Sequence, residues 1–206
     1  MCNFYLCGIF LIAVIIACLL PVIKGNTGEI SIRLELCLLP KEKYKVLNDI
    51  IIKTKRGTTQ IDHIVVSQYG IFVIETKNFT GLITGNTNTL EWTKNMYGKK
   101  FKFRNPIIQN KGHIRALSKA LNISENKFTS IVVFVNDCSL NIDTKSIVIH
   151  DDKLLKIIKY YKTEKIDKQD VEKISDKIKK LNKKGILMRI KHVMYVKERQ
   201  RENRNR

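Results

Sequence analysis

Residues Gln60–Asn78 read QIDHIVVSQYGIFVIETKN, and the architecture of the chain can be worked out from this segment. Two apolar segments rich in β-branched residues flank SQYG at 67–70, a pattern that predicts two strands joined by a hairpin turn. Side chains alternate between faces along a strand, so we expect Glu75 and Lys77 on one face and Thr76 on the other. Packing does not require two opposite charges in so apolar a strand. The pair therefore indicates a functional use.

Asp62, Glu75 and Lys77 together suit metal-assisted hydrolysis of a phosphodiester. Two converging carboxylates favour a hard divalent cation such as Mg²⁺ or Mn²⁺, and the backbone carbonyl of Thr76 could supply another oxygen. An ammonium beside the metal could hold the attacking water and offset charge that builds up in the transition state. The alternative is structural: Asp62 would serve the turn, and Glu75 and Lys77 would form an exposed pair worth under about 1 kcal/mol.

Several further motifs extend this pattern in order along the chain. Gly28-Glu29 opens an expected helix, QIDHIVV spans 60–66 and GIFVIETKN spans 70–78. Gly81, ITG at 83–85, Trp92, RNPIIQN at 104–110, His113-Ile114 and Ala116-Leu117 follow. From Gly28 to about Leu121 the chain resembles the NERD (nuclease-related) domain, a member of the PD-(D/E)XK restriction-endonuclease-like superfamily.

The resemblance implies a restriction-endonuclease-like α/β core in which helices flank a mixed β-sheet. It also implies a metal-dependent nuclease centre at Glu29, Asp62, Glu75 and Lys77, with Glu29 on the first helix as an extra metal ligand. The flanking helix after Pro106 brings Gln109 within reach as a secondary candidate, whereas His113 is expected to be structural or solvent-facing. The alternative is a module of the same fold that binds nucleic acid, or acts as a membrane scaffold, without cutting.

The N-terminal segment is almost unbroken apolar sequence from Phe4 to Leu20, continued by PVI at 21–23. About 20 apolar residues suffice to cross a bilayer as a helix, so residues 1–24 are expected to be a membrane anchor. Basic residues follow this segment and none precedes it, which favours a single-pass protein with its large domain in the cytoplasm. A cleaved signal peptide and secretion is the alternative, although no basic region precedes the apolar run.

The chain of 206 residues carries 38 Lys and Arg against 19 Asp and Glu, a formal net charge of +19. Such an excess favours a polyanionic partner, and nucleic acid, with DNA as the expected form, is one candidate. Anionic lipid headgroups are a second candidate. A Lys-, Ile- and Asn-rich composition typical of an AT-rich genome would raise the Lys content without either partner. A homodimer is a further expectation, since double-strand cutting needs two centres.

The remaining pattern predicts alternating strands and helices. We expect a helix at 28–39 with Ile30, Leu34, Cys37 and Leu38 on its apolar stripe, which makes Cys37 a buried thiol. Residues 55–59 are expected to form a turn and 86–104 an irregular segment that ends in an edge strand. Strands are expected at 45–54, 71–77, 82–84, 128–135 and 146–150, and helices at 105–121, 153–161 and 167–181. The parts of the chain are then an anchor (1–24), a nuclease-like domain (25–150), C-terminal helices (151–182) and a basic tail (183–206).

Overall fold

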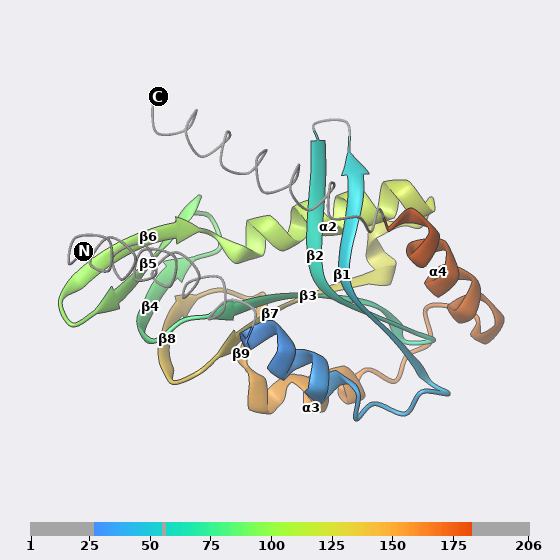
Figure 1. Ribbon diagram of the computed structural model, residues 1–206, viewed down its shortest axis with the longest axis horizontal. Coiled ribbons are helices and arrows are strands. Elements are labelled where there is room, and N and C mark those ends of the chain that lie inside the picture. Colours follow the sequence, from blue (N-terminus) through green and yellow to red (C-terminus); the bar gives the residue numbers. More distant parts are fainter. Residues whose placement is uncertain (1–26, 55–56, 183–206) are drawn as a thin grey trace, which may run out of the picture.

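The computed structural model describes residues 27–54 and 57–182 of the protein. The expected membrane anchor at 1–24 and the basic tail at 183–206 lie outside these ranges. Within them, no helix is both long enough and apolar enough to span a bilayer. The described part is a mixed α/β fold with two mixed sheets flanked by helices (Figure 1).

The larger sheet has five strands in the order β1-β2-β3-β7-β9. The first three are antiparallel neighbours, whereas β7 pairs in parallel with β3 and β9 pairs in parallel with β7. A parallel pair needs a crossover connection, and α2 (Pro106–Leu121) provides it between β3 and β7. The strands are β1 (Tyr44–Thr54), β2 (Gly57–Ser67), β3 (Gly70–Asn78), β7 (Phe128–Val135) and β9 (Ile147–His150).

The smaller sheet contains the chain segments that directly follow β3 and β7: β4 comes after β3, and β8 comes after β7. Its order is β6-β5-β4-β8, with β4 and β8 parallel to each other. Gly81 (φ +88°) and Asn136 (φ 74°) turn the chain where β3 passes to β4 and where β7 passes to β8. A Cβ at position 81 would lie 2.3 Å from the Asn95 carbonyl oxygen, so the junction requires glycine. The strands are β4 (Gly81–Asn86), β5 (Glu91–Met96), β6 (Lys99–Arg104) and β8 (Cys138–Asp143).

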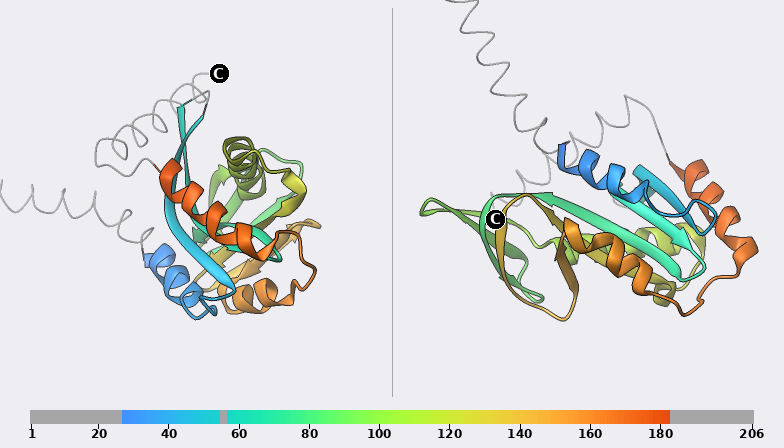
Figure 2. Two further views of the ribbon diagram at one scale, coloured as in Figure 1. Left: turned by 90° about the vertical axis from the view of Figure 1, so that its right-hand side faces the viewer. Right: turned by 90° about the horizontal axis from the view of Figure 1, so that it is seen from below.

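Helices cover both faces of the larger sheet. On one face α2 and α4 (Lys168–Leu181) bury Ile114, Leu117 and Ile178 against β1, β2 and β3. On the other face lie the helix at 27–36 and α3 (Leu154–Tyr160), seen in blue and orange in Figure 2. Short 3₁₀ turns at Glu125–Lys127 and Asp151–Lys153 precede β7 and α3. The sheet is therefore buried on both sides, which explains its long apolar strands.

Most of the predicted elements are confirmed. The hairpin at 60–78 is formed by β2 and β3, and β7 lies between two neighbours in the larger sheet. The predicted start of α2 is also correct: the Asn105 side chain accepts a hydrogen bond from Ile107 N at 2.9 Å, and Pro106 occupies the first turn. The helix ends at Asn122, which adopts the left-handed conformation.

Two loop predictions are wrong. The segment 86–104, expected to be irregular before its final strand, contains the additional strand β5, in which Trp92 is buried. The polar sequence concealed this strand because one face of the small sheet is open to solvent. The expected turn at 55–59 is also too long, since β2 already begins at Gly57. The strand β8 had no counterpart in the sequence prediction.

The apolar stripe assigned to the first helix is wrong as well. Ile30, Leu34 and Leu38 are 51%, 65% and 70% exposed, and the Cys37 thiol is exposed rather than buried. The helix instead buries Ile32 and Leu36, with Leu39 following. Both sets have helical spacing, so periodicity could not choose between them. The buried face is the one that packs against Val65, Phe72 and Ile74 of the larger sheet.

Candidate active site

The motif carboxylates and lysine meet where β2 and β3 lie side by side. His63 pairs with Ile74 in the antiparallel register of β2 and β3, so Asp62 and Glu75 follow at the next step of the two strands. Oδ2 of Asp62 accepts a hydrogen bond from the backbone N–H of Thr76 at 2.8 Å. The expectation that Glu75 and Lys77 share a face is confirmed, because Lys77 Nζ donates to Glu75 Oε1 at 2.5 Å.

Glu75 is the most enclosed member of this cluster, with 2% of its side chain exposed. Its Oε1 accepts hydrogen bonds from Lys77 Nζ and, at 2.6 Å, from Gln109 Nε2. Its Oε2 lies 3.1 Å from His113 Nε2. The alternative of an exposed surface pair for Glu75 and Lys77 is therefore wrong, and the carboxylate is held by a complete set of donors.

Glu75 and Lys77 each stabilise the charged form of the other. Burial disfavours the ionised form of Glu75, but the Lys77 ammonium and the His113 hydrogen bond outweigh it and lower the pKa to about 2. Burial likewise disfavours the charged form of Lys77, yet Glu75 and Asp62 raise its pKa above the ordinary value, against a smaller opposing effect of Arg104. At neutral pH the site therefore contains a carboxylate and an ammonium in direct contact.

The pKa of Asp62 is shifted in the opposite direction to that of Glu75. Burial raises its pKa well above the ordinary value, and the nearby charges of Glu75 and Glu29 raise it further, while Lys77 and the Thr76 N–H oppose the rise. Oδ1 of Asp62 makes no hydrogen bond among the described residues, in contrast to Oδ2. A carboxyl with neighbouring carboxylates and a raised pKa is typical of a functional site.

Glu29 reaches this cluster from the helix at 27–36. A Cβ on Gly28 would lie 2.8 Å from the Cβ of Asn78, so glycine lets the start of the helix dock directly on the end of β3. Glu29 is half-buried there, and its charge acts on Asp62. The structure thus brings Glu29, Asp62, Glu75, Lys77 and Gln109 to one end of the β2–β3 pair. Their roles in catalysis stay a prediction.

The contact of His113 with the site was not predicted from the sequence. His113 was expected to be structural or solvent-facing; the solvent-facing alternative is wrong, because the side chain is buried and contacts the central carboxylate through Nε2. Its Nδ1 lies 2.8 Å from the Thr59 hydroxyl, so both ring nitrogens are engaged. The available signal was the spacing of Gln109 and His113, four residues apart on one helical face. Both side chains point to Glu75, one to each oxygen.

His63 lies beside Asp62 in the sequence but not in the site. It is on the opposite face of β2, where it is buried and its Nδ1 lies 2.7 Å from Asn48 Oδ1. Burial, reinforced by the positive charge of Arg33 and partly offset by Glu75, lowers its pKa to about 4. His63 is therefore neutral at physiological pH.

The donor set can be compared with the needs of a divalent cation. In the part of the chain that the structure describes, no three His, Cys, Asp or Glu side chains are gathered in positions to share one ion. The site does supply hard carboxylate oxygens on Asp62, Glu75 and Glu29, the ligand type that Mg²⁺ and Mn²⁺ prefer. The residue types therefore fit such an ion, and Oδ1 of Asp62 is the oxygen that makes no hydrogen bond within residues 27–54 and 57–182.

Comparison with known proteins agrees with this geometry. Residues 24–135 match the nuclease-related domain (NERD) family. The chain belongs to the NERD family. It is also 34% identical over 181 residues to an uncharacterized protein of Bacillus anthracis, and the match covers 85% of each chain. No solved structure matches the chain. Membership in the NERD family indicates a nuclease-related function and, in general terms, interaction with nucleic acid and use of a divalent metal.

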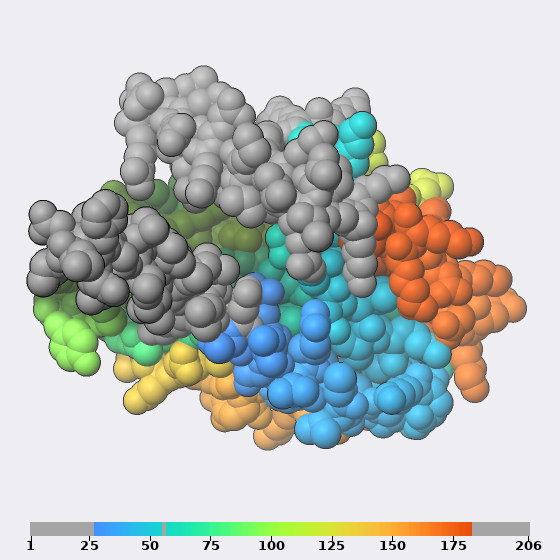
Figure 3. All heavy atoms as spheres, in the orientation of Figure 1, coloured from blue at the N-terminus to red at the C-terminus, as the bar shows by residue number. Residues whose placement is uncertain are grey.

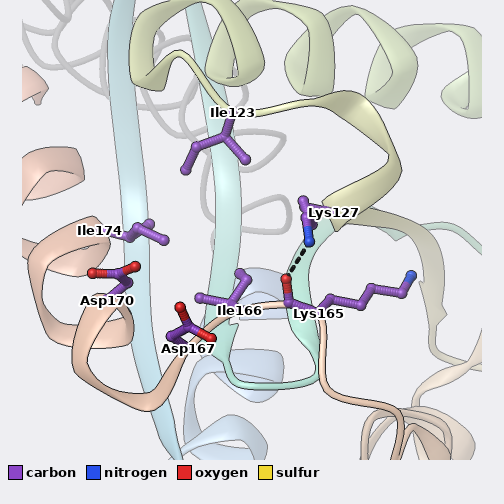
Figure 4. A pocket seen from close by; sticks show the side chains of 7 residues that line it. All are labelled: Ile123, Lys127, Lys165, Ile166, Asp167, Asp170 and Ile174. Carbon is purple, nitrogen blue, oxygen red and sulfur yellow. Dashed lines mark hydrogen bonds between the residues drawn. The ribbon is translucent and has the colours of Figure 1, made fainter.

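A shallow hollow of about 260 Å³ lies away from this NERD site (Figure 4). Ile123, Ile166 and Ile174 line it together with charged residues, and Lys127 Nζ donates to the Lys165 carbonyl across it at 2.5 Å. Lys127 and Lys165 lie beside Gly70, at the start of β3, whereas Glu75 and Lys77 lie toward its end. The hollow contains no member of the cluster around Glu75.

Proposed function

We propose that this NERD protein hydrolyses phosphodiester bonds in DNA with Mg²⁺ or Mn²⁺ as cofactor, in a core of the restriction-endonuclease-like type. The observation that carries the proposal is the convergence of Asp62, in the middle of β2, with Glu75 and Lys77, near the end of β3, where Lys77 Nζ lies 2.5 Å from Glu75 Oε1. The raised pKa of Asp62, caused by burial and then by the charges of Glu75 and Glu29, adds support. Such crowding of carboxylates is relieved by a cation.

Each residue has a distinct part in this proposal. Asp62 and Glu75 would hold the metal, and Glu29 would add a ligand or orient water. When bound, the ion supplies polarisation of the phosphate and lowers the pKa of a water ligand. Lys77 remains protonated, so it can donate to the attacking water or to a phosphate oxygen where negative charge builds up. Gln109 donates a hydrogen bond from Nε2 to the Glu75 carboxylate. Its amide oxygen accepts from Lys77 Nζ at 3.4 Å and so helps to keep the ammonium in place.

The cellular setting belongs to the same proposal. The apolar segment Phe4–Leu20 and the basic residues that follow it support a single membrane anchor with the nuclease domain in the cytoplasm. Secretion after cleavage is the competing arrangement. A dimer would place two centres on one duplex. Full-length protein can be tested for both properties by membrane fractionation with protease protection and by sedimentation in detergent.

The decisive experiment compares full-length variants, purified in mild detergent, on circular, linear and branched DNA and on RNA. Each reaction contains Mg²⁺, Mn²⁺ or EDTA. Lys77→Met and Glu75→Gln are expected to reduce cleavage by about 100-fold or more, because the first removes the ammonium that would stabilise charge on the phosphate and the second removes the charge of a metal-binding carboxylate. Lys168→Ala, on the exposed surface of α4, is the matched control and should cut like wild type. Equal cleavage by wild type and Lys77→Met would overturn the proposal.

A binding module without cleavage is the second candidate, and one observation favours it. Glu75 is already neutralised by Lys77 and bound by Gln109 and His113, so its oxygens are engaged without any ion. In that case the cluster stabilises the fold and the protein holds DNA at the membrane. Metal-independent DNA binding, together with no cleavage of any substrate in Mn²⁺, would identify this function.

A further inference from the structure

The β5–β6 hairpin concentrates positive charge outside the cluster around Glu75. Residues 91–104 read EWTKNMYGKKFKFR, with five Lys or Arg side chains and one carboxylate. The hairpin forms one end of the described fold, opposite α4, as the ribbon shows in Figure 1. The space-filling view shows its tip in bright green at the edge of the molecule (Figure 3). Its single ion pair among the described residues, Lys102–Glu91, is long (3.8 Å) and exposed, so it neutralises little.

The cations of β6 form a regular row. Lys100, Lys102 and Arg104 alternate with Phe101 and Phe103, so these three cations project from one face of the strand. All three are exposed. Successive members are about 6.6–6.8 Å apart along the strand, because each residue advances about 3.3–3.4 Å. This spacing is close to that of consecutive phosphates on one nucleic-acid strand.

Aromatic side chains accompany the row. Tyr97 is 97% exposed at the tip of the hairpin, where it and Gly98 adopt positive φ angles of 51° and 79°. Such a turn matches the twist of the two strands and presents its first side chain outward. Phe101 is 48% exposed and lies next to Lys94, whose Nζ is 5.5 Å from the ring centroid. Exposed aromatics interleaved with cations are the usual means of binding single-stranded nucleic acid.

The hairpin is connected directly to the candidate active site. Lys94 Nζ lies 5.2 Å from the ring centroid of Phe79, which follows Lys77 by two residues. At the other strand, Arg104 is close enough to Lys77 for its charge to act on it. Arg104 also directly precedes Asn105, the N-cap of the helix that carries Gln109. A strand bound along β6 would therefore lead to the carboxylate cluster.

We propose that the β5–β6 hairpin is a nucleic-acid-binding arm that holds single-stranded DNA beside the active site. The row Lys100, Lys102 and Arg104 contacts successive phosphates, and Tyr97 stacks on an unpaired base. This inference rests on the proposed nuclease function and names its substrate class: DNA with an unpaired segment next to the cleaved bond. Anionic lipid would also be attracted by the charges, but lipid binding gives no reason for the row to lead to Lys77.

The test measures binding without cleavage, in EDTA, by the anisotropy of a labelled single-stranded oligodeoxynucleotide with full-length protein in detergent. Lys100→Ala/Lys102→Ala should weaken binding about 20-fold at 0.1 M salt and reduce the slope of log K against log salt by about 1.4. Tyr97→Ala should weaken single-strand binding about 5-fold or more and leave binding of a duplex of equal length unchanged. Lys168→Ala/Lys180→Ala removes two exposed charges at the opposite end and should bind like wild type within about 2-fold.

The outcomes separate this inference from the proposed function. If the double variant at positions 100 and 102 binds the oligonucleotide as tightly as wild type, the hairpin is not a binding arm, even if the protein cuts DNA. Equal losses in the arm and control variants would also overturn it, because they would show general charge attraction. Loss of binding to phosphatidylserine vesicles with unchanged oligonucleotide binding would assign the arm to the membrane instead. The double variant at positions 100 and 102 could lose binding as expected while wild type and Lys77→Met cut equally. That result would support the hairpin as a binding arm and refute the proposed nuclease site.

Discussion

His113 lies with its Nε2 3.1 Å from Oε2 of Glu75. This contact joins the crossover helix α2 to the strand that carries the candidate catalytic residues. Because Gln109, one turn earlier, binds Oε1 of the same carboxylate, α2 fixes the side-chain orientation of Glu75. The helix that connects the parallel strands thus also organises the site.

Replacing His113 tests this positioning role. His113→Ala leaves Oε2 of Glu75 buried without its donor, so we expect the free energy of unfolding to fall by about 1–3 kcal/mol. Thr59→Val removes only the hydroxyl beside Nδ1 and should lower it by about 0.5–1.5 kcal/mol. Urea unfolding measures both, and nuclease assays should show a lower kcat for His113→Ala. Full stability and full kcat in His113→Ala would show that Glu75 is oriented without the ring.

The depressed pKa of Glu75 predicts a specific pH dependence of stability. Burial opposes ionisation, but Lys77 and His113 lower the pKa of this carboxyl from an ordinary 4.5 to about 2. The stabilisation from its charge is therefore complete above about pH 4.5 and is lost as the pH falls toward 2. The difference in unfolding free energy between wild type and Glu75→Gln should shrink from pH 5 to pH 3 in urea titrations. A constant difference across that range would contradict the assigned pKa.

Asp62 should destabilise the metal-free protein. Burial and then Glu75 and Glu29 raise its pKa, so its contribution to stability is greatest at low pH and falls as the pH rises through the raised pKa. We expect Asp62→Asn to raise Tm at pH 7 in EDTA by a few degrees, since about 1 kcal/mol shifts Tm by about 2–4 °C at this size. The amide oxygen can still accept from Thr76 N–H. The gain should fade at pH 4 in thermal scans, and a lower Tm at pH 7 would refute this prediction.

Gly28 should be sensitive to a single added methyl group. Gly28→Ala places a Cβ 2.8 Å from the Cβ of Asn78, which forces the helix at 27–36 away from β3. We expect a loss of about 1–3 kcal/mol in the free energy of unfolding, with weaker Mn²⁺ binding by calorimetry as Glu29 moves from Asp62. Gly112→Ala is the control: nothing lies within 4 Å, and alanine in α2 should stabilise by about 0.5–1 kcal/mol. Similar effects of the two substitutions would show that Gly28 has no docking role.

Local sequence pattern was sufficient for the central strands, for the helix that begins at Asn105-Pro106 and for the shared face of Glu75 and Lys77. Strand alternation, helix capping and β-branched content act over a few residues, so they can be recognised without a fold. The same holds for Gln109 and His113, whose spacing put them on one helical face. Polar strands with one solvated face were missed, as β5 and β8 illustrate.

Tertiary packing decided everything that depends on contacts between distant segments. The first helix has two apolar stripes, and packing against the larger sheet and α3 buries Ile32 rather than Ile30. The burial of Glu75, the role of His113 and the opposite pKa shifts of Glu75 and Asp62 arise because four elements, the helix at 27–36, β2, β3 and α2, meet in one small volume. Desolvation and charge coupling depend on distances in space, which no local pattern contains.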